Sequence, residues 1–329
     1  MWKHKVSTKE YFSEKYRDYI SNSKLSHINP EEDGSPEKFK EGFSNEYNPS
    51  FEVGSAVHAM LLQPDEYEIS NIRKPTGKLG AFAEFVYNHR KKGLKIVDAI
   101  EQASLEANYY VGKLSPKRLE TAIKTSLPFY LERIHFKEDP IKVPLFLSEP
   151  NFIKVNSGIT NAENHKDFMK YLNPSYVFIE PLVFNEYAIL CEVNILDSKG
   201  RILKTIKVKA KFDNVTIDLE MGIVALNDVK TTGKPSAWFM GNFHYIDKVW
   251  MPGAFEQYRY YRQVAMYMWL LQAYVQKEYT ENTFRYQSNI LIIETIPEYL
   301  VRVCNINNTW VQRGVKEFKD LLILASNEY

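Results

Sequence analysis

Two aspartates and a lysine in the middle of the chain are the residue types that metal-dependent phosphodiester hydrolysis needs. Asp213 is followed by a predicted hairpin and then by the run Asp228-Val-Lys230-Thr-Thr. If the two strands pair, Asp213 and Asp228 can converge on one cation, and carboxylate oxygens suit Mg²⁺ or Mn²⁺. Lys230 could orient or deprotonate the attacking water, or offset charge in the transition state. The alternative is a surface hairpin with scattered charges, because an isolated D-x-K pattern is common.

A predicted helix over Tyr260–Tyr274 presents Gln263 and Tyr267 one turn apart. Side chains at positions i and i+4 project together from a helix. A glutamine and a tyrosine can hydrogen-bond a phosphate or a base without adding charge that competes with a metal. The alternative is an amphipathic core helix, with Val264 and Met268 in its apolar stripe and the two polar residues at its edge.

His58 and Glu192 are two further candidate metal ligands. His58 lies on a predicted helix with Ser55 as its expected N-cap, and a neutral imidazole there could bind the metal or contact a substrate phosphate. A structural histidine is the alternative. Glu192 lies in an apolar predicted strand, where an isolated carboxylate would be costly. It could therefore be a second metal ligand or one half of a salt bridge to a lysine.

The elements that must position these residues predict an α/β fold. Strand patterns fill residues 176–232, at Tyr176–Glu180, Ala188–Leu196, Ile202–Phe212, Val215–Asp218 and Ile223–Val229. A long helix at 254–277 precedes two strands, Ile290–Thr295 and Leu300–Ile306, and a helix from about Thr309. A mixed central β-sheet flanked by helices is the natural packing of these elements.

Alternation along the second of these strands predicts its two faces. Lys207, Lys209, Lys211 and Asp213 should share one face, with Val208, Ala210 and Phe212 on the other.

Turn signals divide the chain into an N-terminal segment and a main domain. Residues 1–50 are polar and predict short helices and loops that pack on the core. Residues 51–329 form the main domain, with a mostly helical insertion at about 72–175 in which no motif is found.

Composition excludes several classes of protein. The chain has 329 residues, and 42 basic and 41 acidic side chains give a net charge of +1, so any surface for a polyanion must be local. Only two cysteines are present, which argues against a disulfide framework, an iron–sulfur cluster or a structural zinc site. The chain starts without an apolar signal region, and no apolar run approaches the ~18 residues of a membrane span. We expect a cytoplasmic protein in a reducing compartment.

In these motifs, and in their order, the chain resembles the PD-(D/E)xK nuclease superfamily, and within it the exodeoxyribonuclease VIII (RecE-type) group of phage and prophage exonucleases. The resemblance spans most of the chain and rests on five blocks: the S-x-S-x-L segment in Tyr19–Ile28, the G-x-x-x-H helix and its trailing run in Phe51–Glu66, the basic approach to the first aspartate in Lys209–Asp213, the D-x-K-T-T block in Asn227–Thr232, and the Q-x-x-x-Y helix in Tyr261–Tyr267.

The resemblance implies a restriction-endonuclease-like core and a site with assigned roles. Its metal ligands would be Asp213, Asp228, His58 and the backbone carbonyl of Val229, and Glu192 stands roughly where the family has an earlier strand glutamate. Lys230 would be catalytic together with the aspartates, and Gln263 and Tyr267 would act on the substrate side. The cofactor would be Mg²⁺, with Mn²⁺ as a substitute. Two departures from the family are Lys211-Phe212 in place of the usual Arg-Pro and a longer hairpin between the aspartates.

The same resemblance implies a 5′→3′ exonuclease that digests one strand of linear double-stranded DNA and leaves 3′ single strands for recombination. Expected partners are double-stranded DNA ends, a single-strand annealing protein and further copies of the chain in a ring-like homo-oligomer. Basic residues should line the path of the DNA. Candidates on one predicted strand are Lys204, Lys207, Lys209 and Lys211, and others are Lys113, Lys117 and Arg118.

Two alternatives remain open at the level of sequence. One is a structure-specific or end-processing endonuclease on the same core; no G-x-x-x-x-G-K-[ST] loop occurs, so any motor would be a separate chain. The other is a catalytically inactive module that binds DNA ends, although a dead site would have no need to keep Asp213, Asp228 and Lys230.

Overall fold

The structure, a computed structural model, describes most of the chain. The described residues are 3–4, 6, 8–41, 49–109, 117, 120, 124, 126–133, 142–174, 180–244, 246 and 248–328. They form two compact units: residues 1–48 together with 160–329, and residues 49–159. The second unit overlaps the helical insertion predicted at about 72–175 but has other bounds, and the predicted division into domains stays a prediction.

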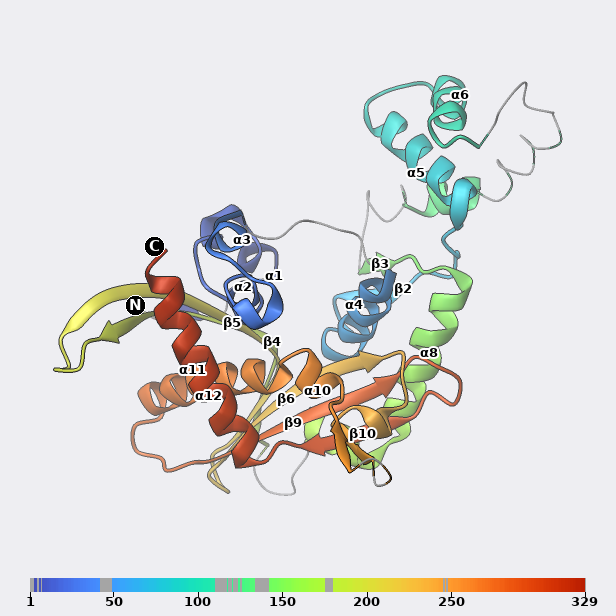
Figure 1. Cartoon of the computed structure of the whole chain (residues 1–329). Coiled ribbons are helices and arrows are strands. Elements are labelled where there is room, and N and C mark those ends of the chain that lie inside the picture. The colour runs from blue at the N-terminus through green and yellow to red at the C-terminus, as the bar shows by residue number, and fades with distance from the viewer. Residues whose placement is uncertain are drawn as a thin grey trace. The chain divides into compact units, whose positions relative to one another are not determined.

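A mixed β-sheet forms the centre of the first unit (Figure 1). Its strands lie in the order β1-β4-β5-β6-β9-β10, with bounds β1 Lys3–His4, β4 Leu182–Leu196, β5 Ile202–Asp218, β6 Ile223–Thr232, β9 Arg285–Glu294 and β10 Val301–Asn305. Strands β6 and β9 are parallel, and all other neighbours are antiparallel. The predicted fold class, a mixed α/β sheet with flanking helices and a helical N-terminal region, is confirmed.

The strands are longer than the sequence patterns predicted. Strand β4 begins six residues before the predicted start at Ala188, because Leu182–Tyr187 contains polar residues that hide its strand character. The two strands predicted at Ile202–Phe212 and Val215–Asp218 are one strand, β5. The strand predicted at Tyr176–Glu180 falls mostly outside the described residues, and Glu180 itself is not in a strand.

The alternation predicted over Lys207–Asp213 does not continue along the rest of β5. The core under α11 (Tyr260–Glu278) takes Val208 and Phe212 from even positions but Val215 and Ile217 from odd positions. The face presented to the core therefore switches next to Asp213. Strand β4 switches at the same level, since Ile189 and Tyr187 join this core together with the partly buried Phe184.

Helices cover both faces of the sheet. On one face, α11 packs against α12 (Asn308–Ser326), as Figure 1 shows. The single helix predicted at 254–277 is two helices, α10 (Ala254–Gln257) and α11, because Arg259 between them adopts a left-handed conformation with φ 54°. The short helix α9 (Lys166–Leu172) lies near β5, β6 and β10.

The N-terminal segment packs on the sheet through short helices: α1 Thr8–Tyr11, η1 Glu14–Tyr16, α2 Asn22–Ser26, η2 Pro30–Glu32 and α3 Pro36–Glu41. Ile20 forms a bridge with Val208 of β5, and its backbone N–H donates to the carbonyl of Lys207 at 2.9 Å. Tyr11 and Tyr16 bury their rings against Ala188 and Leu190 of β4. The segment is therefore an integral part of the first unit.

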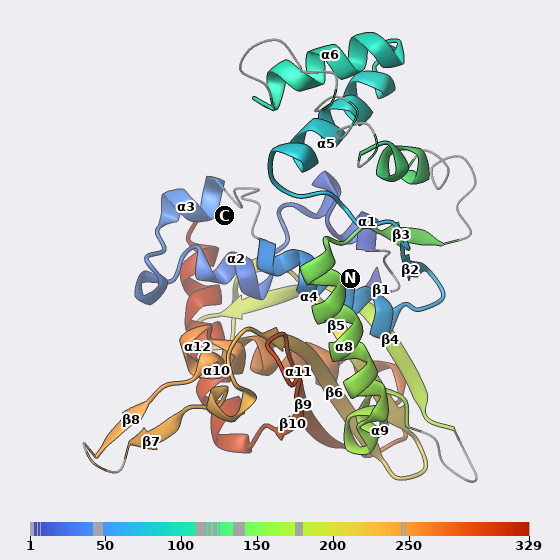
Figure 2. The same ribbon diagram turned by 90° about the vertical axis from the view of Figure 1, so that its right-hand side faces the viewer.

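A hairpin follows β6 in the first unit. Thr232 leads through η3 (Ser236–Trp238) into β7 (Asn242–His244) and β8 (Val249–Met251), which Figure 2 shows as a projecting pair of strands. Among the described helices, none combines the length and apolarity needed to cross a membrane.

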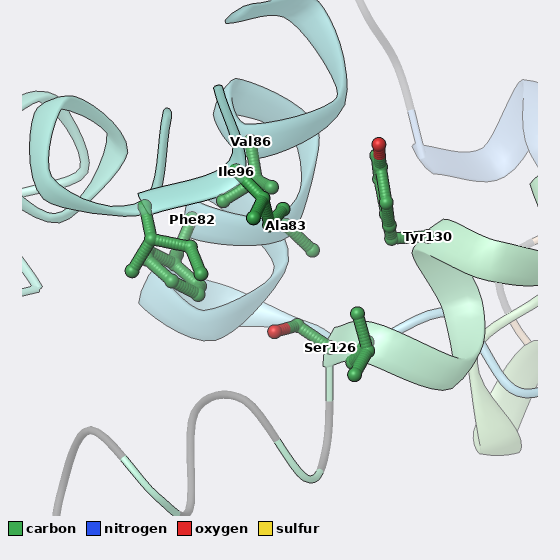
Figure 3. A pocket seen from close by; sticks show the side chains of 8 residues that line it. Phe82, Ala83, Val86, Ile96, Ser126 and Tyr130 are labelled. Atoms are coloured by element: carbon green, nitrogen blue, oxygen red, sulfur yellow. The ribbon is translucent and has the colours of Figure 1, made fainter. Parts of the chain in front are cut away.

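The second unit is mostly helical: α4 Pro49–Leu62, β2 Tyr67–Ile69, α5 Gly77–Lys91, α6 Ile96–Glu106, a helix with described residues 126–133, β3 Val143–Leu145 and the first part of α8 (Glu149–Asn164). Helix α4 begins six residues before Ser55, so the prediction of Ser55 as an N-cap is wrong. Phe82, Val86, Ile96 and Tyr130 line a small apolar pocket between the helices (Figure 3).

Candidate active site

The D-x-K motif forms a tight cluster at the end of strand β6. Strand β6 is buried on both sides up to Val229, so Asp228 and Lys230 occur where an apolar strand reaches the rim of the sheet. The Lys230 Nζ lies 2.5 Å from the Asp228 Oδ2. The Gln263 Nε2, on α11, donates to the Asp228 Oδ1 at 3.0 Å. The geometry thus brings together a lysine, an aspartate and the glutamine of the Q-x-x-x-Y helix.

Asp213 lies on the neighbouring strand at the same level. Asn214 is paired with Asn227 in the β5–β6 ladder, so Asp213 and Asp228 occupy adjacent positions on the two strands. The backbone N–H of Val229 donates to the Asp213 Oδ2 at 2.7 Å. The Asp213 side chain therefore accepts a hydrogen bond where a regular ladder would have a backbone carbonyl as the acceptor. This hydrogen bond fixes one oxygen of Asp213.

Lys230 is held as a cation by its surroundings. Burial alone would lower the pKa of Lys230, but the carboxylates of Asp228 and Asp213 outweigh that effect and raise it above its ordinary value. The Nζ also lies 5.1 Å from the ring centroid of Tyr260, within the range of a cation–π contact. This environment favours a role in offsetting negative charge over a role in deprotonating water.

Tyr267 lies beside the same carboxylates as a neutral phenol. Burial raises the pKa of Tyr267 well above its ordinary value, and Tyr11, Asp228 and Asp213 act in the same direction. Its ring contacts Phe212 edge-on, with the centroids 5.3 Å apart. A protonated hydroxyl at this place can donate a hydrogen bond but cannot act as an anion.

Glu186 is a candidate ligand that the sequence patterns missed. It lies opposite Asp213, between the paired positions Asn185↔Asn214 and Tyr187↔Phe212. One carboxylate oxygen of Glu186 lies within 4.8 Å of one of Asp213. Its backbone is left-handed, with φ 51°, a strained conformation that is often found at functional sites. The only signal in the sequence is the polar pair Asn-Glu before a run of apolar strand residues.

The chemistry of this acidic pair fits a divalent cation. Glu186 and Asp213 are both half-buried and come from adjacent strands. Two carboxylates at this separation supply hard oxygen ligands that Mg²⁺ or Mn²⁺ accepts. Lys211 forms an ion pair with Glu186. A cation bound at Glu186 would therefore compete with this ammonium group.

Glu192 lies elsewhere on the same strand. It is exposed and opposite Lys207, so its neighbour is a lysine, as in the salt-bridge alternative. It is six positions along the strand from Glu186, or ~20 Å at the usual rise. Glu192 is therefore too far along β4 to share a cation with Asp213.

The four strand lysines proposed to bind DNA do not form one exposed surface. The Lys209 Nζ donates to the carbonyls of Tyr11 and Tyr16 at 3.0 and 2.9 Å, and burial together with Lys24 lowers its pKa. The Lys204 Nζ donates to the carbonyl of Ser326 at 2.6 Å, and Lys211 is paired with Glu186.

Of the four strand lysines, only Lys207 is exposed; it lies over the ring of Tyr19. Of the other basic candidates, Lys113 and Arg118 lie outside the described residues, and Lys117 is exposed.

Two of the predicted metal ligands, His58 and the carbonyl of Val229, remain predictions. His58 is half-buried on α4 of the second unit, and its role as a metal ligand stays a prediction. Val229 is buried and paired with Leu291 of β9, and its N–H serves Asp213. A ligand role for its carbonyl stays a prediction.

The second unit also contains a polar hollow, lined by Glu52, Lys74, Glu84 and Arg133 among others. Its charges pair with each other: Lys74 with Glu52 at 3.2 Å and Arg133 with Glu84 at 2.5 Å. This neutralised arrangement does not single out a ligand.

Comparisons with known proteins add little to this geometry. No protein-family model and no curated protein matches the chain. Among solved structures, the chain is similar to a crystal structure described as a "Putative exonuclease" from Eubacterium rectale, with 13% identity and a TM-score of 0.49. The alignment covers 99% of this chain and 88% of that chain. A likeness this distant carries no conclusion about this chain, so its function must be inferred from its own residues.

Proposed function

We propose that this protein is a Mg²⁺-dependent deoxyribonuclease of the PD-(D/E)xK type. The observation that carries the proposal is the cluster at the rim of the sheet: Lys230 in contact with Asp228, and Asp213 held beside them by the N–H of Val229. A cation, an adjacent pair of carboxylates and neutral hydrogen-bond donors are the groups that hydrolysis of a phosphodiester requires.

Each residue has a separate task in this proposal. Asp213 and Asp228 would hold the metal, with Glu186 next to Asp213 as a further ligand. When bound, Mg²⁺ would supply positive charge to the scissile phosphate and lower the pKa of a coordinated water. Lys230 offsets negative charge that develops on the phosphate, because its ammonium group stays protonated. Gln263 orients Asp228 through its hydrogen bond.

The finer proposal follows the resemblance of the sequence to the exodeoxyribonuclease VIII group. The protein would degrade linear double-stranded DNA from an end in the 5′→3′ direction and leave 3′ single strands for recombination. Double-stranded DNA ends, a single-strand annealing protein and other copies of the chain in a ring would be its partners. His58 would be an additional metal ligand, as the G-x-x-x-H block predicts.

The test is a time course on linear duplex DNA labelled at its 5′ or 3′ end, with Mg²⁺ and with EDTA. Lys230→Ala should lower the rate of nucleotide release at least about a hundredfold, because one group that stabilises the transition state is removed. Lys234→Ala is the matched control: Lys234 is exposed four residues further on and should leave the rate unchanged.

Four outcomes would contradict all or part of the proposal. Full activity of Lys230→Ala, or activity that survives EDTA, would mean that the cluster is not the active site. Cleavage of covalently closed circular duplex would favour an endonuclease over the exonuclease. Binding of DNA ends without nucleotide release in Mg²⁺ or Mn²⁺ would favour an inactive end-binding module.

A further inference from the structure

Five asparagines form a continuous row of side-chain hydrogen bonds across the sheet, one from each of β4, β5, β6, β9 and β10. Each Nδ2 donates to the Oδ1 of the next asparagine at 2.5–2.8 Å, in the order Asn305, Asn289, Asn227, Asn214, Asn185. The strand register places all four neighbouring pairs directly opposite one another. We refer to this row as the asparagine ladder.

The ladder also closes the end of helix α9. The Nδ2 groups of Asn227 and Asn214 donate to the carbonyls of Tyr171 and Leu172 at 2.7 and 2.9 Å. These carbonyls belong to the last turn of α9, where no intrahelical donor is available. Asn214 and Asn227, both fully buried, thereby use both amide hydrogens and the amide oxygen.

The ladder lies one residue away from each carboxylate of the candidate site. Asn185 precedes Glu186, Asn214 follows Asp213, and Asn227 precedes Asp228. Neighbouring strand residues point to opposite faces, and accordingly Asn227 contacts α9 while Asp228 contacts α11.

The other two rungs are different. Asn289 is followed by the buried Ile290, and Asn305 lies between Cys304 and Ile306, so no carboxylate is next to either.

The backbone needs support at this level of the sheet. The pair Glu186–Asp213 is missing from the β4–β5 ladder, Glu186 is left-handed, and both strands change the face that they present to the core. A left-handed residue within a strand is strained and persists only where the surrounding structure holds it in place. An amide can both donate and accept along such a row, whereas an ionised carboxylate has no donor.

We propose that the asparagine ladder is a positioning device for the metal site: it locks the register and twist of β4, β5 and β6 from the opposite face. Glu186 and Asp213 thereby keep the spacing that a divalent cation needs, and Asp228 keeps its place beside Asp213. The inference rests on the proposed function. Buried polar residues can fix one register among several of similar stability, and hydrogen bonds in a row reinforce one another. The rungs on β9 and β10 then contribute stability without positioning a ligand.

Asn185→Ala and Asn305→Ala are a matched pair that tests this division. Both residues are exposed end rungs, and each is joined to a buried asparagine by one side-chain hydrogen bond. Asn305 also donates to the Tyr171 hydroxyl at 3.2 Å. Both variants should fold. Asn185→Ala should weaken Mn²⁺ binding, measured by calorimetry, about tenfold, the range found when groups that orient a ligand are removed. Asn305→Ala should leave it within about twofold. The value of kcat on linear duplex should follow the metal affinity.

A second readout is independent of the metal. The N–H of Val229 donates to the Asp213 Oδ2, so its hydrogen exchange in the metal-free protein, measured by NMR, reports the position of that carboxylate. Exchange should be faster in Asn185→Ala than in the wild-type protein, and unchanged in Asn305→Ala.

The inference fails, and the proposed function stands, if the wild-type protein binds Mn²⁺ and degrades DNA and both end-rung variants have the wild-type Mn²⁺ affinity and rate. It also fails if both lose metal affinity equally, because the ladder would then be only structural. A wild-type protein without Mn²⁺ binding or DNA hydrolysis would overturn the proposed function itself. Asn214→Leu removes a buried rung and should weaken Mn²⁺ binding more than Asn185→Ala does.

Discussion

Glu186 connects backbone geometry to chemistry at the scale of single residues. Its left-handed φ of 51° costs free energy, of the order of 1–3 kcal/mol for a residue other than glycine. The ion pair with Lys211 and the approach to Asp213 are the local interactions that accompany this conformation. A strained acidic residue opposite another acid is better explained by a ligand role than by stability.

Glu186→Gln should therefore lower the affinity for Mn²⁺ at least about tenfold, because one anionic oxygen ligand becomes a neutral amide. Glu192→Gln is the matched control, since Glu192 is on the same strand but exposed and opposite Lys207. Calorimetric titration of both proteins separates the two assignments. A larger loss of Mn²⁺ affinity in Glu192→Gln than in Glu186→Gln would mean that Glu192, and not Glu186, is the ligand.

Helix α11 is the element that supplies Gln263 and Tyr267, and α12 fixes its position. The two helices approach closely at Gly314, where an added Cβ would lie 2.3 Å from the carbonyl oxygen of Tyr261 and 2.6 Å from the Cβ of Ala265. The contacted residues flank Gln263. The placement of Gln263 on Asp228 thus depends on a glycine in another helix.

Gly314→Ala should destabilise the protein although alanine is the better helix former. The gain in helix propensity is about 1 kcal/mol. Forcing α11 and α12 apart against a backbone oxygen should cost up to about 3 kcal/mol, so a net loss of up to about 2 kcal/mol is expected. Chemical denaturation measures it. Gly233→Ala, where a Cβ meets nothing within 4 Å, should change stability little; equal effects would show that the helix contact is unimportant.

At the scale of the whole molecule, the first unit is assembled from two distant pieces of chain. Arg262 on α11 is fully buried and joins them: its guanidinium donates to Asn22 at 3.0 Å and to Ser26 at 2.7 Å, and it pairs with Glu32 and Glu317. Residues before 49 and after 160 therefore share one buried polar network. That network lies next in sequence to Gln263 of the candidate site.

The contribution of Glu32 to stability should depend on pH. Burial would raise the pKa of Glu32, but the hydrogen bond and charge of Arg262 outweigh it and hold the pKa below its ordinary value. The stabilisation is therefore fully present above the unfolded pKa of ~4.3 and is lost as the pH falls through the folded pKa. Glu32→Gln should cost about 1.5–3 kcal/mol near pH 7.

Thermal unfolding of wild-type protein and Glu32→Gln between pH 7 and pH 3 measures this difference. The difference in unfolding temperature between the two proteins should shrink below about pH 4. Glu31→Gln is the control, because Glu31 is exposed and its pair with Arg259 should be worth less than about 1 kcal/mol. A gap that stays constant with pH would mean that Glu32 does not stabilise the unit as an anion.

The proximity of Asp228 and Lys230 was predictable from the sequence because it depends on local geometry. Asp228 and Lys230 are two residues apart at the end of an apolar strand, and the period of a strand puts them on one face. Gln263 and Tyr267 are one helical turn apart for a similar reason. The mixed sheet with flanking helices followed from the same periodicities.

Glu186, the asparagine ladder and the Arg262 network were decided by the tertiary structure alone. Each depends on which strands are neighbours and in what register, or on contacts between residues more than 200 positions apart, as for Arg262 and Glu32. Periodicity reports the face on which a side chain lies but not the strand opposite it. The packing of the whole core sets the strand register, and this register places Glu186, rather than Glu192, opposite Asp213.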